Sequence, residues 1–411
     1  MDVREERGKK IAAMGAVKKT AKDLVFQVAA QSRNKYYRVN LEGDDPVCDC
    51  PDFELHNKAC KHIFAVAFTV VGQQNPDGST TVTESGTVTA RKQKTYPQNW
   101  PAYNKAQTTE QDKFQALLHD LCAGIQEPES KFGRPPLPLK DMIYSTTFKT
   151  YSTFSGRRFM SDLREAHERG YIGKTPHYNS IFRYLESESL TPILRDLVIQ
   201  SSLPLKSVET DFAVDSSGFT TSKFIRWFDV KYGKPRAEHQ WVKAHLICGV
   251  KTHVVTAIEI GEQFSGDAPF FPPLVATTAK NFTISEVSAD KAYDSIKCVE
   301  SVVAAKGTPY IALRTTATGG VGGAYQQMFH YFQFKRDEFL EHYHKRSNCE
   351  SVFSMVKRKF GDYLRSKTDA AMLNEALCKI LCHNIVVLIH EMHELGIEPI
   401  FWQDHSTAVA G

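Results

Sequence analysis

The sequence predicts an α/β protein: a mixed sheet flanked by helices, preceded by a helical region and by a small module built around cysteines and a histidine. Three observations predict this. Short apolar runs alternate with helical patterns in the C-terminal half, as at Phe212–Val214 and Ile284–Ala289. Residues 140–206 have the pattern of several short helices. Near the N-terminus, three cysteines and a histidine follow a predicted β-hairpin.

The composition is that of an ordinary globular protein with two or three domains, since the chain has 411 residues of which 42% are hydrophobic. It has no apolar run of about 18 residues, so we expect no membrane span. The charged N-terminus does not resemble a signal peptide. Nine cysteines without a secreted-protein pattern favour a reducing, cytoplasmic interior. The net charge of +4 is mild, so the basic residues matter by their clustering.

The first module begins with a predicted hairpin, 23–29 and 35–41, and ends with an apolar helix at 63–71. Between them stands the spacing Cys-x-Cys-x9-Cys-x-His, formed by Cys48, Cys50, Cys60 and His62. Three thiolates and an imidazole are the ligands that tetrahedral zinc prefers in a closed structural site. So short an apolar segment needs a metal ion to stabilise its fold, and we therefore expect one structural Zn²⁺.

This arrangement resembles the SWIM zinc finger, in which Cys50-Pro-Asp-Phe and Cys60-Lys-His-Ile are typical. His56 also lies in the loop, but the family spacing selects His62 as the fourth ligand. SWIM fingers bind either DNA or protein, and both partners stay open here.

The segment after the finger, 72–107, loses periodicity and is rich in Ser, Thr, Gly and Gln, which predicts a flexible linker. A capping box at Thr109 then predicts the start of an amphipathic helix that runs to Ile125. An α/β domain begins near 207. Its strand candidates are 212–214, 224–230, 242–250, 253–260, 284–289 and 309–313, and its first helix candidates are 271–280 and 295–306.

Three acids stand where a ribonuclease-H-like sheet would carry them. Asp215 follows the apolar run Phe212–Val214, Asp290 follows the apolar run Ile284–Ala289, and Glu350 lies on a predicted helix. Carboxylates that meet in this way can hold two magnesium (or manganese) ions. Asp211 is the rival to Asp215, but it precedes the apolar strand, so we expect it to face solvent.

The helix around Glu350 carries the most specific pattern in the chain. At 100° per residue, a phenol, a guanidinium and an ammonium lie with the carboxylate within about 60° of one another. These side chains are Tyr343, Arg346, Glu350 and Lys357. Another sector has core-like spacing, with Val352, Val356 and Phe360.

At these residues the chain resembles the insertion-sequence transposases of the DDE type, in the branch with the signature Tyr-x2-Arg-x3-Glu-x6-Lys, which it matches at every position. Trp241-Val-Lys243-Ala-His245 also resembles the strand that follows the first acid in such enzymes. The resemblance implies metal-dependent cleavage at transposon ends and strand transfer into target DNA. Asp215, Asp290 and Glu350 would be the catalytic metal ligands. Tyr343, Arg346 and Lys357 would contact DNA.

The resemblance also assigns the remaining regions. Helices in 108–206 resemble an end-binding region that would enter the major groove, with a plain helical scaffold as the alternative. Only 59 residues separate Asp290 from Glu350, too few for the β-rich insertion of some relatives. We expect the domains 1–71 (finger), 72–107 (linker), 108–206 (DNA-binding region), 207–396 (catalytic domain) and 397–411 (tail).

The expected partners are transposon-end and target DNA and a second copy of the chain, in a prokaryotic nucleoid. Two rivals stay open: a domesticated, non-cleaving DNA-binding regulator, and a nuclease of the same fold. The last predicted helix, 372–395, carries Cys378, Cys382 and three histidines, for which buried packing is favoured over a metal site.

Overall fold

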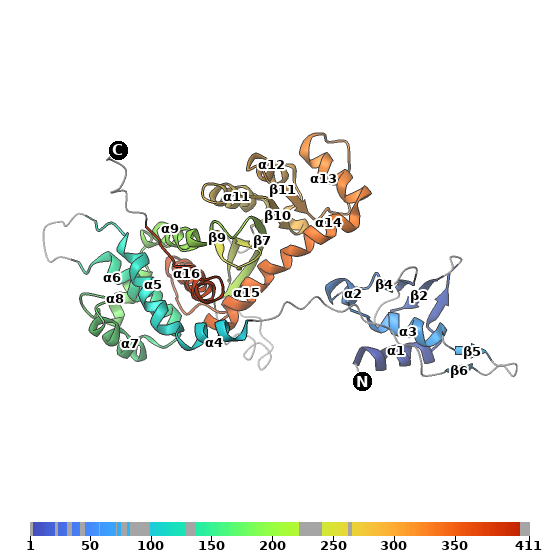
Figure 1. Cartoon of the computed structure of the whole chain (residues 1–411), viewed down its shortest axis with the longest axis horizontal. Coiled ribbons are helices and arrows are strands. Elements are labelled where there is room, and N and C mark those ends of the chain that lie inside the picture. Colours follow the sequence, from blue (N-terminus) through green and yellow to red (C-terminus); the bar gives the residue numbers. More distant parts are fainter. Residues whose placement is uncertain are drawn as a thin grey trace. The chain divides into compact units, whose positions relative to one another are not determined.

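The computed structural model describes residues 3–20, 24–30, 35–41, 46–56, 58–70, 72–74, 80–82, 99–128, 136–221, 241–261 and 265–402. The chain forms two compact units, Met1–Pro97 and Gln98–Gly411 (Figure 1). Most of the predicted linker, 75–79 and 83–98, lies outside the described residues, as does the predicted strand at 224–230.

The N-terminal unit is a small antiparallel sheet packed against helices. Its strands lie in the order β1 (Val17–Lys19), β2 (Val25–Ala29), β3 (Tyr36–Asn40) and β4 (Val47–Cys48). The predicted hairpin is β2–β3, and the predicted apolar helix is α3 (Lys61–Val70). The sequence reading missed α1 (Val3–Ala13), whose Ile11 joins the core of α3 and the sheet, and the short α2 (Pro51–His56). Strands β5 (Gly72–Gln74) and β6 (Thr80–Val82) pair within the segment predicted as linker.

The C-terminal unit is built on a five-stranded mixed sheet in the order β11-β10-β7-β8-β9. Strands β7, β8 and β9 are antiparallel neighbours, whereas β10 runs parallel to both β7 and β11. This is a ribonuclease-H-like mixed sheet, as the sequence predicted. The strand bounds are Asp211–Thr220 (β7), Trp241–Gly249 (β8), Val255–Gly261 (β9), Glu286–Ala289 (β10) and Thr308–Ile311 (β11).

Helices cover both faces of this sheet, because successive strand side chains point alternately to two cores. On one face Phe212 and Val214 pack with α11 (Phe271–Ala279) and α12 (Ile296–Ala304). On the other, Ala213 and Leu246 pack with α15 (Ser347–Phe360) and α16 (Asp369–Glu394). Between β11 and α15 come α13 (Gly323–Phe334) and α14 (Arg336–Tyr343).

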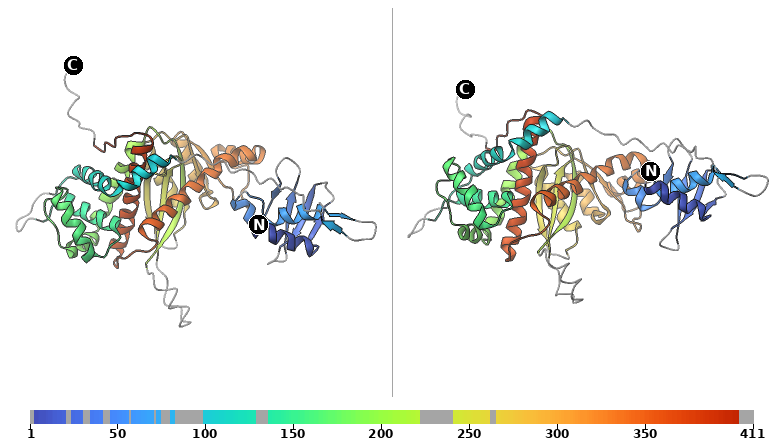
Figure 2. Two further views of the ribbon diagram at one scale, coloured as in Figure 1. Left: turned by 60° about the horizontal axis from the view of Figure 1, so that its bottom comes forward. Right: turned by 90° about the horizontal axis from the view of Figure 1, so that it is seen from below.

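Helix α16 lies between the helical region and the strands (Figure 2). Its Asn384 ties the layers together: the side chain accepts from Val255 N at 2.9 Å and donates to Val198 O at 3.2 Å. Within the described residues α16 is the one helix long and apolar enough to cross a membrane, but 94% of its apolar window is buried in the protein. Cys378 and Cys382 are fully buried there, as predicted for core packing.

The predicted run of short helices is present. It comprises α6 (Leu139–Ser152), α7 (Gly156–Glu168), α8 (Tyr178–Leu185) and α9 (Leu190–Ser202), and it follows α4 (Trp100–Thr108) and the predicted amphipathic helix α5 (Glu110–Ala123). Two details differ from the prediction. Helix α4 begins inside the segment predicted as linker, where the Asn99 side chain caps Ala102 N. The predicted capping box fails because the Thr109 hydroxyl donates to Lys105 O of α4 instead, at 2.8 Å.

Candidate active site and zinc centre

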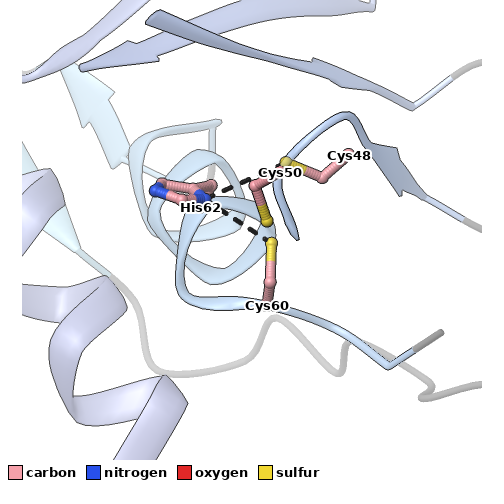
Figure 3. Close-up of side chains that lie close together, drawn as sticks. All are labelled: Cys48, Cys50, Cys60 and His62. Atoms are coloured by element: carbon pink, nitrogen blue, oxygen red, sulfur yellow. Dashed lines mark hydrogen bonds between the residues drawn. The ribbon is translucent and has the colours of Figure 1, made fainter. Parts of the chain in front are cut away.

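The zinc centre is assembled from short, neighbouring pieces of the N-terminal unit. Cys48 ends β4, Cys50 precedes α2, and Cys60 and His62 stand at the start of α3. All four side chains are buried, and their ligand atoms lie within 4.8 Å of one another (Figure 3). Among the described residues this is the one group of three or more such side chains gathered this closely. His56, the predicted competitor, has no described side chain.

The geometry fits a tetrahedral metal. Nδ1 of His62 lies 3.9 Å from Sγ of Cys48 and 3.8 Å from Sγ of Cys60. Zinc bonds of about 2.3 Å to sulfur and about 2.0 Å to nitrogen would set these atoms about 3.6 Å apart. Hydrogen bonding with Cys50 raises the pKa of the Cys48 thiol, because crowded thiols resist ionising together. A divalent cation would stabilise them as thiolates.

The two predicted aspartates lie side by side on adjacent strands. Ala289 pairs with Val214, so Asp290 follows β10 next to Asp215 of β7. By strand alternation Asp215 shares its face with Ala213, the face that α15 covers. Oδ1 of Asp215 accepts from Ser216 N at 2.8 Å, and Oδ1 of Asp290 accepts from Ala292 N at 2.8 Å.

Glu350 reaches the same face from α15 but is turned differently. Its neighbour Cys349 is buried, with Sγ 3.9 Å from Leu246 O, which sets this turn of the helix against β8. The Glu350 side chain is 55% exposed, and Oε1 accepts from Arg346 Nη1 at 2.8 Å. The three carboxylates therefore share one face, yet they are not gathered as tightly as the thiols of the finger.

The three acids lie close enough to influence one another's charge. Burial, together with the charges of Asp290 and Glu350, raises the pKa of Asp215 to about 6, although the hydrogen bond from Ser216 N and the charge of Arg346 lower it. Crowded carboxylates of this kind are oxygen donors for a hard divalent ion such as Mg²⁺ or Mn²⁺. The donor set thus fits the predicted metal.

The sequence predicted that the signature residues lie on one continuous α-helix, and this prediction is wrong. A 3-10 segment, His344–Arg346, separates α14 from α15, so uniform 100° spacing does not hold across it. Arg346 lies over the ring of Tyr343 at 5.5 Å and also binds Glu350. Lys357 is engaged elsewhere, because its Nζ donates to Ser217 Oγ of β7 at 2.6 Å. Burial lowers the pKa of this lysine.

Asp211 was expected to face solvent, and this prediction is wrong. Its carboxylate lies 2.8 Å from Lys345 Nζ, which also contacts Glu286 at 2.7 Å. His342 contacts the same glutamate at 2.6 Å. Asp211 therefore belongs to a separate ion-pair network that fixes the 3-10 segment to β7 and β10.

A further acid near the site, Asp267, was not predicted from the sequence. Its Oδ1 lies 2.5 Å from Lys243 Nζ and 3.5 Å from His245 Nδ1, and it accepts from Ser216 Oγ at 3.1 Å. Ser216 points to the face opposite Asp215, so this cluster lies behind the acids. The pattern Trp-x-Lys-x-His marked its two basic members, but no local motif marks the aspartate.

Sheet order and acid placement define the class: a ribonuclease-H-like core with carboxylates at the junction of its central strands. Two family models then match the chain, the transposase DDE domain over residues 206–385 and the SWIM zinc finger over residues 37–70. The chain is a DNA transposase of the DDE type with an N-terminal SWIM zinc finger. It accordingly acts on DNA and uses a divalent metal for catalysis and zinc in the finger.

No curated protein sequence matches the chain significantly. Among solved structures it is similar to a piggyBac transposase in a synaptic complex with hairpin DNA, at 10% identity and a TM-score of 0.33, over 73% of this chain and 77% of that one. A likeness at this level carries no weight for the assignments below.

Proposed function

We propose that Asp215, Asp290 and Glu350 form the catalytic metal site that cleaves transposon ends and joins them to target DNA. The strand register carries this proposal, because pairing of Ala289 with Val214 sets the two aspartates side by side under α15. Bound there, two magnesium (or manganese) ions would activate the attacking oxygen and stabilise the leaving oxygen.

In the first reaction a water oxygen forms a bond to phosphorus, and the bond from phosphorus to the 3′-oxygen at the element's end breaks. The leaving oxygen takes up a proton and becomes a 3′-hydroxyl. In the second reaction this hydroxyl attacks a target phosphodiester in line and displaces a target 3′-oxygen. One site serves both steps, because each exchanges one P–O bond for another.

Glu350 must turn away from Arg346 to share a metal with the aspartates. A DNA phosphate beside the guanidinium would supply the alternative partner, since Arg binds phosphate oxygens as it binds carboxylates. Arrival of the DNA end would in this way release Glu350 toward Asp215. Tyr343 beneath the guanidinium would keep Arg346 in place.

Lys357 is proposed to contact the DNA end with Arg346 and Tyr343. Its present bond to Ser217 holds the ammonium close to β7, two residues beyond Asp215. Together these residues match the Tyr-x2-Arg-x3-Glu-x6-Lys branch, which we propose for this chain.

Several finer features belong to the same proposal. We propose one Zn²⁺ in the finger, a homodimer on paired DNA ends, and an intracellular, nucleoid-associated site of action in a prokaryote. The proposed regions are the finger at 1–71, the linker at 72–107, the DNA-binding helices at 108–206, the catalytic domain at 207–396 and the tail at 397–411. The first part of that tail already docks on α5, where Trp402 Nε1 donates to Asp120 O at 3.1 Å.

The decisive experiment incubates the purified protein with its element-end DNA and Mg²⁺ and follows cleaved ends and joined products. We expect both products from the wild type and neither from Glu350→Gln. Binding without cleavage would favour a domesticated regulator. Cleavage without joining would favour a plain nuclease. Normal cleavage by Glu350→Gln would show that the site is misassigned.

A further inference from the structure

A cavity of about 460 Å³ lies where the helical region meets the loop that follows α15. Its walls come from the end of α6, the start of α7, helix α8, residues 365–367 and the first turns of α16. None of the three catalytic acids lines it. It is large enough for a small ligand, because ligand pockets start at about 300 Å³.

Basic side chains give this cavity an excess of positive charge. They are Lys149, Arg365, Lys367 and Lys379. Two of them are already bonded: Lys379 donates to Gly361 O at 2.9 Å, and Arg365 donates to Phe154 O at 3.3 Å. The Lys149 ammonium has no hydrogen-bond or ion-pair partner among the described residues. Burial lowers its pKa to about 8, and an anion beside it would raise that pKa again.

The two acids that line the cavity, Glu375 and Glu186, offset only part of the charge of the four bases. The Glu375 carboxylate is buried, accepts from the backbone N–H groups of Arg365 and Ser366 at 2.9 and 2.8 Å, and lies 3.9 Å from Lys379 Nζ. Glu186 lies on an exposed rim. Lys149 and the exposed Lys367 therefore remain for an incoming anion.

Further polar groups belong to the walls of the cavity. The hydroxyl of Thr146 is buried and has no partner among the described residues, although Thr146 lines the cavity. Ser155 and Gly156, at the N-terminal end of the 13-residue helix α7, also line it, and Ser155 makes no side-chain capping bond. A helix N-terminus offers unpaired N–H groups and a positive dipole end to a phosphate.

Aromatic side chains lie beside the start of α7 in the same cavity. Phe154 and Phe182 line the cavity and are 47% and 40% exposed. The ring of Phe182 packs tightly on Gly156, since a Cβ there would come within 2.7 Å of it. Exposed rings beside a phosphate-binding edge are what single-stranded DNA uses, with the base stacked and the phosphate held by cations.

We propose that this cavity binds one unpaired nucleotide of the DNA strand, with the base against Phe154 and Phe182 and the phosphate at Lys149 and the start of α7. The inference rests on DNA being the partner of this transposase. Phe360, which lines the cavity, follows Glu350 by ten residues of α15, or about 15 Å at 1.5 Å per residue. That span is about four base pairs, so the nucleotide would lie near the cut.

The test measures binding of the full chain to two labelled duplexes by fluorescence anisotropy. One is a blunt 30-base-pair DNA, and the other has the same sequence with one unpaired thymidine. An unpaired base is used because it costs least to draw out of the stack. We expect the wild type to bind the bulged duplex about tenfold more tightly, since one stacked base contributes that much or more.

Lys149→Met and Phe182→Ala should lose this preference and keep their affinity for the blunt duplex. Lys149→Arg should retain it. The matched controls are Lys140→Met, an exposed lysine on the same helix, and Phe334→Ala, an exposed aromatic of α13. Unchanged melting temperatures of the variants would exclude misfolding as the cause.

The proposal is overturned if the wild type shows no preference or if both pocket variants keep it. It is also overturned if dTMP binds in a Lys149-dependent way while the bulged duplex gains nothing, because the cavity would then serve a free nucleotide. Cleavage of element-end DNA, followed in parallel, reports on the proposed function separately. Intact cleavage without a preference for the bulged duplex would overturn the proposal for the cavity and leave the proposed function unaffected.

Discussion

The finger and the catalytic face solve the same problem, holding a cation, in opposite ways. The four zinc ligands come from residues 48–62, all buried and within 4.8 Å of one another. The three acids come from β7, β10 and α15, and Glu350 is 55% exposed and bonded to Arg346. One site is closed, whereas the other is open to solvent and to DNA.

This difference follows from what each metal does. A structural zinc contributes folding free energy, so its ligands surround it and exclude water. A catalytic metal must expose coordination positions to water and to the scissile phosphate. A carboxylate held by an arginine can exchange partners when DNA arrives, but a buried thiolate cluster cannot.

The largest effect that this contrast predicts is loss of the finger's fold. Cys60→Ser removes one ligand from a closed site whose binding free energy is about 10–16 kcal/mol in comparable structural sites. We expect loss of zinc and of hydrogen-exchange protection in β2 and β3, with the C-terminal unit unchanged. The exposed Lys58→Ala in the same loop should leave both intact. Full hydrogen-exchange protection of β2 and β3 without bound zinc would contradict the proposed difference between the two metal sites.

A second pair of variants compares two aspartates of β7. Asp215→Asn should reduce cleavage about a thousandfold, or about 4 kcal/mol of transition-state stabilisation, because it removes a metal ligand. Asp211→Asn should change cleavage less than about tenfold, since Lys345 keeps Glu286 as a partner. Single-turnover cleavage at saturating DNA measures both. A larger loss for Asp211→Asn would reverse the assignment of the first acid.

Arg346→Gln examines the arginine that holds Glu350. We expect affinity for element-end DNA to fall about tenfold, and the slope of log affinity against log salt to fall by about one, because one phosphate contact is lost. Arg336→Gln, in the preceding helix, should change neither quantity. An unaltered salt slope for Arg346→Gln would mean that this guanidinium serves Glu350 alone.

The smallest effect concerns support around the zinc. The ring of Tyr37 lies 4.8 Å from that of His62, whose Nε2 is buried without a partner among the described residues. Tyr37→Leu should weaken zinc binding about threefold, below the tenfold or more that a hydrogen-bonding outer partner contributes. Competition with a chromophoric chelator measures this, with the exposed Tyr36→Leu as control. A hundredfold loss would make Tyr37 part of the centre itself.

Patterns in short segments of the sequence correctly predicted features that depend on those segments alone. Apolar alternation located β7 and β10, and their register then had to bring Asp215 next to Asp290. Contacts between distant residues were missed or misjudged. Asp267 meets Lys243 across 24 residues, and Asp211 meets Lys345 across 134 residues, so no spacing rule could connect them.

The break between α14 and α15 was also beyond the sequence. Nothing in His344-Lys-Arg346 disfavours an α-helix, yet Lys345 is drawn to Asp211 and Glu286, and the chain tightens into a 3-10 turn there. Tertiary ion pairs thus overrode a continuous helical pattern.

The sequence by itself predicted the cysteines and histidine that gather in the finger, the mixed sheet flanked by helices, and Asp215 and Asp290 beside two of its strands, because each depends on spacing along a short segment or on a short apolar run. Only the tertiary structure decided that Glu350 rests on Arg346, that Lys357 binds Ser217, and that a basic, aromatic-lined cavity opens beyond α15. The physical reason is that side-chain partners are chosen by distance and charge in space. Helix packing sets both, and residues remote in the chain become neighbours only after folding.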